Sequence, residues 1–179
     1  MTADWRGDVL KSWFGLDDKI WWRGPPELDQ RIRDDFLELW RAKRQLPVKT
    51  FLDDPLSALA AIILFDQFPR NMFRGHAEQF STDHIALAIA KAAIDKGFDD
   101  QLPPRERAFL YMPFEHSEAI ADQNRAMLLF TALGDEEMLH FAKLHHAIIA
   151  RFGRFPHRNA MLGRASRADE IGAGDVVPW

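Results

Sequence analysis

Two short segments of this chain carry arginine and asparagine in nearly the same order. They read "FPRNMFRG" at residues 68–75 and "FPHRNAMLGR" at residues 155–164, and each follows an apolar stretch. Arginine presents a planar fork of donors that suits a carboxylate or a phosphate. A helix N-terminus beside such a turn adds a partial positive charge. Together these parts are typical of an anion-binding pocket, although the net charge of the chain is −4.

The candidate ligand-binding residues come from both segments and their borders. They are Asp66, Gln67, Arg70, Asn71, Arg74, Arg154, Arg158 and Asn159. The alternative is structural, because buried arginines also bind carbonyls at helix ends or pair with buried acids. Both interpretations, an anion site and a pair of structural locks, remain open from the residues alone.

Acids and a histidine gather in a third segment, "YMPFEHSEAIADQNR". Glu115, Glu118 and Asp122 are spaced at i, i+3 and i+7, on one face if a helix is continuous there. Acids so close repel one another, so we expect the two arginine turns to lie opposite them. His116, His157 and Glu118 are the candidate catalytic residues, because histidine beside carboxylates is suited to general acid–base chemistry.

A metal ion is the competing use of this third segment. Its spacing matches no HExxH signature, so the sequence predicts no metal site. His140, His145 and His146 follow later, at offsets that are poor for one ligating face, and we expect them at the surface or in packing.

Several other kinds of site are excluded by the composition and the motifs. The chain has no cysteine, which removes disulfides, thiolate nucleophiles and cysteine-bound metals. It has no GxSxG elbow, Gly-rich phosphate loop or dinucleotide fingerprint. No cofactor is therefore expected.

Length and charge bound the protein class. With 179 residues, 47% of them hydrophobic and 28% charged, we expect a single globular domain over residues 1–179. Its last part, residues 165–179, is expected to form a short helix and a tail. The negative net charge argues against nucleic acid and anionic membranes as partners. The longest apolar run, residues 58–65, is below the roughly 20 residues that span a bilayer. We expect a cytoplasmic protein, with a homo-oligomer as one option.

The elements that must position these residues are helices nearly throughout. Leu28, Ile32, Phe36, Leu39 and Trp40 form one stripe of an amphipathic helix. Strand signals are nearly absent, so the predicted fold class is all-α.

The helix boundaries follow from caps and prolines. An apolar helix is predicted with Asp53 or Asp54 as its N-cap and Pro55 in its first turn, and it should end at Phe68, where Pro69 disfavours its continuation. Further signals predict the later helices. They are a kink or a break at Pro113, a restart at Ser117 or its neighbours, ends at Gly97, Gly134 and Gly153, a cap at Asp135, and a last capping box from Ser166 to Asp169.

These segments resemble the bacterial proteins catalogued as domain of unknown function 924. The matching stretches are "WFG" (13–15), "LFDQFPRNMFRG" (64–75), "ERAFLYMPFEHSE" (106–118) and "FGRFPHRNAMLGR" (152–164). The resemblance implies a tetratricopeptide-like fold, which we expect to contain about eight helices in antiparallel hairpins. The family has no established activity, so the resemblance implies no catalytic residue.

Three functions follow from the sequence. The first is binding of an anionic small molecule or a peptide carboxylate by the arginines and asparagines of the two turns. The second is an enzyme that uses His116 or His157 with Glu118 in the same pocket. The third is a scaffold that binds a protein partner along an exposed apolar groove.

Overall fold

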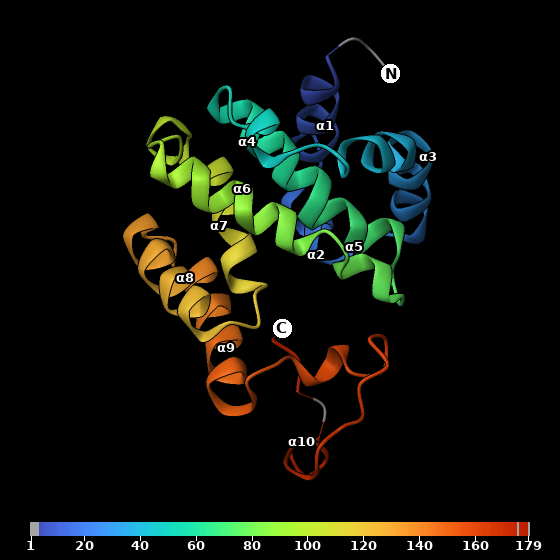
Figure 1. The fold of residues 1–179 in the computed structure, drawn as a ribbon, viewed down its shortest axis with the longest axis vertical. Coiled ribbons are helices and arrows are strands. Elements are labelled where there is room, and N and C mark those ends of the chain that lie inside the picture. Colours follow the sequence, from blue (N-terminus) through green and yellow to red (C-terminus); the bar gives the residue numbers. More distant parts are fainter. Residues whose placement is uncertain (1–3, 175, 179) are drawn as a thin grey trace. The chain divides into compact units, whose positions relative to one another are not determined.

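The chain folds into helices joined by short connections (Figure 1). The computed structural model describes residues 4–174 and 176–178, and within these ranges every regular element is a helix and none is a strand. The predicted all-α class is therefore confirmed. The tetratricopeptide-like arrangement of the helices stays a prediction.

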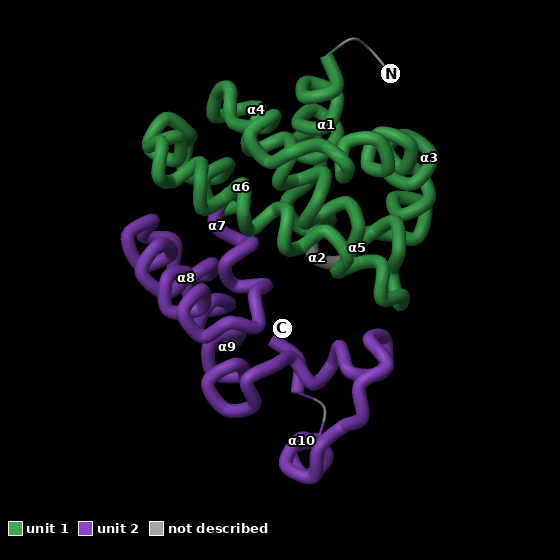
Figure 2. Tube along the Cα trace, in the orientation of Figure 1, with its two compact units in different colours: residues 1–110 green, residues 111–179 purple. Residues whose placement is uncertain are grey.

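Two compact units make up the chain, Met1–Leu110 and Tyr111–Trp179 (Figure 2). We call them unit 1 and unit 2. Helix α7, Pro104–Glu115, contains the boundary between them.

Unit 1 is built around an apolar central helix. Its α4 and the turn that follows it bury every residue from Ala58 to Gln67. The stripe predicted on α3, from Leu28 to Trp40, is buried as well. The helices that lie entirely in this unit are α1 (Trp5–Phe14), α2 (Asp18–Arg23), α3 (Pro26–Lys43), α4 (Pro55–Ile62), α5 (Phe68–Met72) and α6 (Asp83–Asp95).

The predicted end of the apolar helix at Phe68 is wrong. A π-helical turn, Ile63–Gln67, follows α4, and the Phe68 amide donates to the Ile63 carbonyl five residues earlier. Helical structure then continues through α5 to Met72. The wider turn places Pro69 in the first turn of α5, where its missing N–H breaks no helical hydrogen bond. Side chains of the following residues are therefore presented from a helix instead of a loop.

Unit 2 contains a hairpin of two packed helices, α8 (Ile120–Leu133) and α9 (Glu136–Phe152) (Figure 1). Gly134 ends α8 with a φ of 77°, and the Asp135 side chain accepts from the Glu137 and Met138 amides. Gly153 ends α9 with a φ of 67°. These three boundary predictions are confirmed, because each depends on a local residue that satisfies free helix-end groups.

Three other boundaries differ from the predictions. Helix α7 continues past Pro113 to Glu115, so the helix does not break there, and α8 begins at Ile120, beyond Ser117. The acids from Glu115 to Asp122 are therefore not on one continuous helical face. The last helix, α10 (Ala168–Gly172), is capped one residue later than predicted, because the Arg167 amide donates to Glu170 Oε2 at 2.7 Å.

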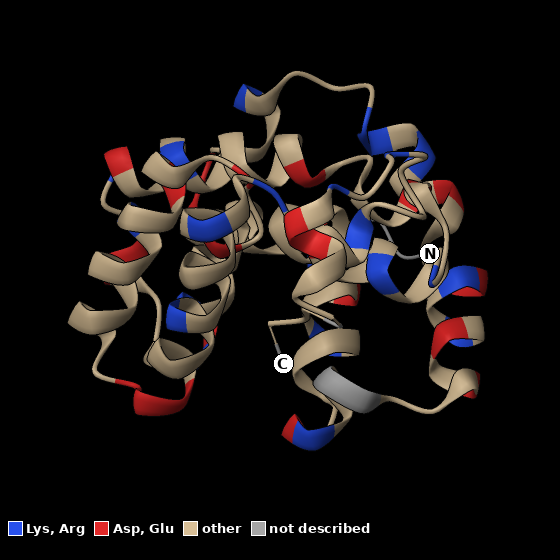
Figure 3. Cartoon of the chain, turned by 90° about the horizontal axis from the view of Figure 1, so that it is seen from below, with Lys and Arg blue, Asp and Glu red and all other residues tan. Residues whose placement is uncertain are grey.

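Charged residues of both signs are interspersed along the helices (Figure 3). In the parts of the chain that the structure describes, no helix combines the length and hydropathy needed to cross a bilayer.

Candidate functional site

The arginines of the first turn, residues 64–75, bind acids from other helices of unit 1. Arg70 donates to both carboxylate oxygens of Asp83, at 3.0 and 3.1 Å, and to the Asp66 carbonyl. Arg74 donates to both oxygens of Asp29, at 2.6 and 2.9 Å, and Asn71 donates to the same carboxylate at 2.8 Å. These acids belong to α3 and α6, and pairing of the first turn with the Glu115–Asp122 segment of unit 2 stays a prediction.

Two candidate residues at the start of the first turn, Asp66 and Gln67, are buried. Asp66 has no exposed surface and Gln67 is 6% exposed. The Gln67 side-chain amide donates to Asp66 Oδ2 at 2.6 Å, and Arg70 Nη1 lies 3.3 Å from Asp66 Oδ1. The five candidate residues of this turn are thus held in two internal networks, one around Asp83 and Asp66 and the other around Asp29.

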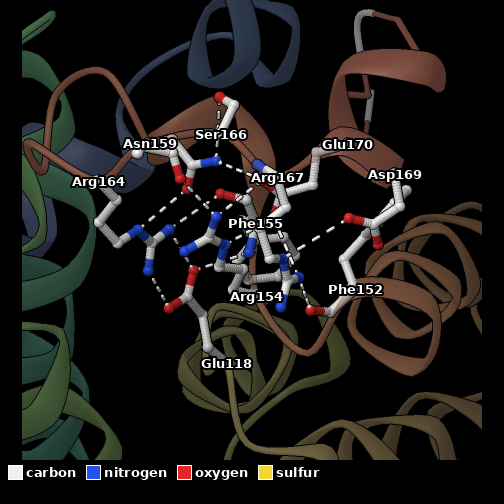
Figure 4. A network of polar contacts seen from close by, with 11 residues as sticks. Glu118, Phe152, Arg154, Phe155, Asn159, Arg164, Ser166, Arg167, Asp169 and Glu170 are labelled. Atoms are coloured by element: carbon white, nitrogen blue, oxygen red, sulfur yellow. Dashed lines mark hydrogen bonds and ion pairs between the residues drawn. The ribbon is translucent and has the colours of Figure 1, made fainter.

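The second turn, residues 152–164, is fixed by a larger network within unit 2 (Figure 4). Arg154 donates to both oxygens of Glu170, at 2.6 and 2.8 Å, and Asn159 donates to Glu170 Oε2 at 3.0 Å. The hydrogen bonds from Arg154 lower the pKa of Glu170, against the opposing effect of burial. Glu170 is therefore an ionised hub that ties α10 to the turn.

Glu118 binds two donor nitrogens of Arg164, as Glu170 binds two of Arg154. Arg164 donates to its two oxygens at 2.7 and 2.9 Å, and the Phe155 amide donates to Oε1 at 2.7 Å. Burial opposes the charge of this carboxylate, but the hydrogen bonds from Arg164 and Phe155 outweigh it and lower the pKa of Glu118. The predicted pairing of the acidic segment with the second turn is confirmed for this residue.

A second carboxylate, that of Glu115, lies near His116. Glu115 Oε1 is 3.9 Å from His116 Nε2, and both residues are mostly buried at the end of α7. The His116 ring lies 5.9 Å from the His145 ring of α9. One possible metal-ligating atom from each of Glu115, His116 and His145 lies within 4.8 Å of the others. We call these three residues the Glu–His–His cluster.

His145 is held in one orientation by the backbone of its own helix. Its Nδ1 lies 2.8 Å from the Phe141 carbonyl oxygen, which can only accept, so Nδ1 carries the proton. Burial, followed by the nearby charges of His116, Arg158 and His157, lowers the pKa of His145 to about 3, although the hydrogen bond to the Phe141 carbonyl acts in the opposite direction. The ring is therefore neutral at neutral pH, with a lone pair on Nε2.

Sequence reasoning missed His145 because it was compared only with the neighbouring histidines. The relevant signal is its place among Ala142, Ile149 and Phe152, which recur at helical spacing and are all buried. A histidine on the buried face of α9 needs hydrogen-bond partners for its ring nitrogens inside the fold.

Phe155, in the first part of the second turn, lies beside this cluster. The Phe155 ring is 5.6 Å from both the His145 and the His157 rings. The Arg158 guanidinium lies 4.4 Å from the Phe155 ring centre, and Arg158 is 7% exposed. Unit 2 thus brings together the predicted residues His116, His157 and Arg158, with Glu115 and His145 added.

A groove of about 1120 Å³ lies in unit 1, lined by residues of α1 and α3. Its charged side chains include Lys11, Arg31, Asp34 and Asp35, which are exposed and of mixed sign. Such a set is typical of a solvated face, so the groove offers less for catalysis than the buried cluster of unit 2.

Comparisons with known proteins agree with the helical fold. A family model described as "Bacterial protein of unknown function (DUF924)" matches residues 9–173. A solved structure of a protein of unknown function, ATU0120 from Agrobacterium tumefaciens, is 37% identical with a TM-score of 0.90. The match covers 97% of this chain and 98% of that chain. No curated protein matches the chain.

Proposed function

This chain belongs to the DUF924 family of bacterial proteins of unknown function. From that premise we propose that unit 2 contains an enzyme active site. Its reaction is acid–base chemistry on an anionic small molecule or a peptide carboxylate. The observation that carries the proposal is the convergence of two histidines and a glutamate from α7 and α9 in one buried place. Buried titratable groups cost stability unless they are used or well compensated, so such a convergence favours a functional site.

His116 is the proposed proton-transfer residue. It is partly accessible, with 13% of its side chain exposed, whereas Glu115 and His145 are more deeply buried. Glu115, 3.9 Å away, is its proposed carboxylate partner. Glu118 receives a supporting role in this proposal, because Arg164 and the Phe155 amide already bind its two oxygens.

Recognition of the anion is assigned to His157 and Arg158. Both follow Phe155, whose ring also contacts His145, so an anion beside them would lie next to the cluster. Arg154 and Asn159 are assigned to holding the turn through Glu170. Arg70, Asn71 and Arg74 are assigned to locking unit 1 through Asp83 and Asp29.

The test is turnover of a panel of small carboxylates, phosphate esters and C-terminal peptides by the wild type and three variants. His116→Ala should lower kcat/KM by about 100-fold or more, since positioned acid–base groups contribute 10²–10⁴-fold. Arg158→Met should mainly raise KM, because it removes charge from the anion site. His140→Ala, on the exposed side of α9, is the matched control and should retain activity. Full activity in a folded His116→Ala variant would contradict the proposal.

Binding without catalysis is the second candidate, because Arg158 is a buried cation beside an aromatic ring, a common element of anion sites. In that case calorimetry detects a ligand from the panel, Arg158→Met abolishes its binding, and no member of the panel is turned over.

A further inference from the structure

We infer that Glu115, His116 and His145 bind a divalent transition-metal ion, with zinc as the best-suited metal. The inference rests on the proposed function's assignment of this cluster as the functional site, and it revises one role. With His116 bound to the ion, proton transfer belongs to a water molecule held at the open position of the metal ion instead of to the His116 ring. Imidazole nitrogen and carboxylate oxygen are ordinary zinc ligands, and three protein ligands leave a position open for water or substrate, as in catalytic sites.

The geometry needs little change to close around an ion. The three ligating atoms lie within 4.8 Å of one another, and Glu115 Oε1 and His116 Nε2 are 3.9 Å apart. Ligand atoms about 2.0–2.1 Å from a tetrahedral zinc ion stand roughly 3.3 Å from each other. Side-chain rotations that move the ligating atoms by about 1 Å therefore bring them to these distances, and α7 and α9 need not move.

The second observation is the fixed tautomer of His145. Its Nδ1–H donates to the Phe141 carbonyl at 2.8 Å, so Nε2 presents a lone pair. Metal-bound histidines commonly donate their other N–H to a carbonyl or a carboxylate in this way, which orients the ring.

The segment that carries Glu115 and His116 is fixed from α8. The buried Gln123 side-chain amide donates to the Glu115 and Ser117 carbonyls, at 2.6 and 2.7 Å. Ser117 Oγ also donates to Asp122 Oδ2 at 2.8 Å. The two ligands therefore stand on a connection that is anchored at both ends, which favours a preorganised site.

Arg158 and His157 add positive charge near His145 and oppose a bare dication. An anion on the open position removes this opposition, because it contacts both the metal ion and the Arg158 guanidinium. We therefore expect the metal ion and an anion to strengthen each other's binding, as reciprocal linkage requires.

The experiment titrates the full chain, stripped with a chelator, with Zn²⁺ by calorimetry and with Co²⁺ by visible absorption. The wild type should bind one equivalent of Zn²⁺, and Co²⁺ should give the ligand-field bands of a low-coordinate nitrogen and oxygen site. Glu115→Gln, His116→Ala and His145→Ala should each weaken Zn²⁺ binding by about 100-fold or more, because removing a group that only hydrogen-bonds to a metal ligand already costs about 10–100-fold. His140→Ala, on the same helix, should bind like the wild type.

Two further measurements separate this inference from the proposed function. Acetate should tighten Zn²⁺ binding to the wild type and not to Arg158→Met, which should still bind the ion. Circular dichroism checks that each variant is folded. If a histidine variant unfolds, Glu115→Gln decides whether the metal site exists, because this substitution hardly changes the shape of the side chain. Wild-type binding below one equivalent, or equal Zn²⁺ affinity in Glu115→Gln and the wild type, overturns the metal site. Turnover by metal-free protein overturns the inference and leaves the acid–base function intact, whereas one tight equivalent without turnover of any panel member supports the metal site alone.

Discussion

The two arginine–asparagine turns have similar sequences but different surroundings. In the first turn, Arg70, Asn71 and Arg74 bind the carboxylates of Asp83 and Asp29, and more than half of the Arg74 side chain is exposed. In the second, Phe155 lies beside His145 of the Glu–His–His cluster, and the turn itself carries His157. The shared motif therefore builds a similar lock in each unit, and the chemistry depends on what the neighbouring helices add.

The hydrogen-bond networks of the two turns also differ in how deeply their side chains are buried. Asn159 is 1% exposed and joins Glu170 to Arg164, whereas Asn71 is 7% exposed and donates to Asp29. Buried hydrogen bonds to charged groups are worth more than exposed ones, and removing one partner leaves the other desolvated. The second turn should accordingly depend more strongly on each member of its network.

The asparagines should show the largest difference. Asn159→Ala removes hydrogen bonds with both Glu170 and Arg164, and we expect a loss of about 3 kcal/mol in the free energy of unfolding. Asn71→Ala should cost about 1 kcal/mol, since Arg74 continues to satisfy Asp29. Urea unfolding followed by circular dichroism measures both values. Equal losses would mean that the two locks are energetically alike.

Replacing an arginine by lysine in each turn tests how much stability depends on the planar guanidinium group with its several donors. Arg164 serves both oxygens of Glu118, the Phe155 carbonyl and Asn159, and its side chain is only 25% exposed. A lysine cannot reach these acceptors together, so Arg164→Lys should cost about 2 kcal/mol.

Arg74→Lys is the matched variant in the first turn. The Arg74 side chain is 56% exposed, and solvent screens its pair with Asp29, so the cost should be at most about 0.5 kcal/mol. The same urea titrations compare the two variants. A larger loss from Arg74→Lys would reverse the order of the two turns.

The sequence predicted local features better than tertiary ones. The caps at Asp54 and Asp135 and the glycine ends of α8 and α9 were foreseeable, because each depends on one residue and its own helix. The π-helical turn before Pro69 was not, since it reflects the packing of a fully buried segment.

Partner choice was the least predictable part of the candidate site. Glu118 was correctly expected to face the second turn, but Asp29 and Asp83, which bind the first turn, lie in helices with no special motif. His145 was missed because its partners come from α7, about thirty residues earlier in the chain. Contacts between distant segments leave no spacing pattern in one sequence.

Acid should act on the second turn through Glu170, with a smaller effect than the asparagine and arginine variants have. The pKa of this carboxyl is lowered in the folded chain, first by the hydrogen bonds from Arg154, while burial acts in the opposite direction. A lowered pKa means that the stabilisation is complete above the ordinary glutamate value of 4.5 and is lost progressively as the pH falls below it. Melting curves from pH 7 to pH 3 should therefore show a falling midpoint, with faster amide exchange in α10.

Glu170→Gln provides the decisive control for this acid effect. The variant should melt lower than the wild type at pH 7, because Arg154 loses its charged acceptor, but its midpoint should fall less between pH 5 and pH 3. Asp29→Asn changes the first turn and leaves Glu170 in place, so it should retain the Glu170 contribution to the acid dependence. If Glu170→Gln and Asp29→Asn fall with identical slopes, the acid response does not arise at the second turn. The difference between the two locks would then be one of burial alone.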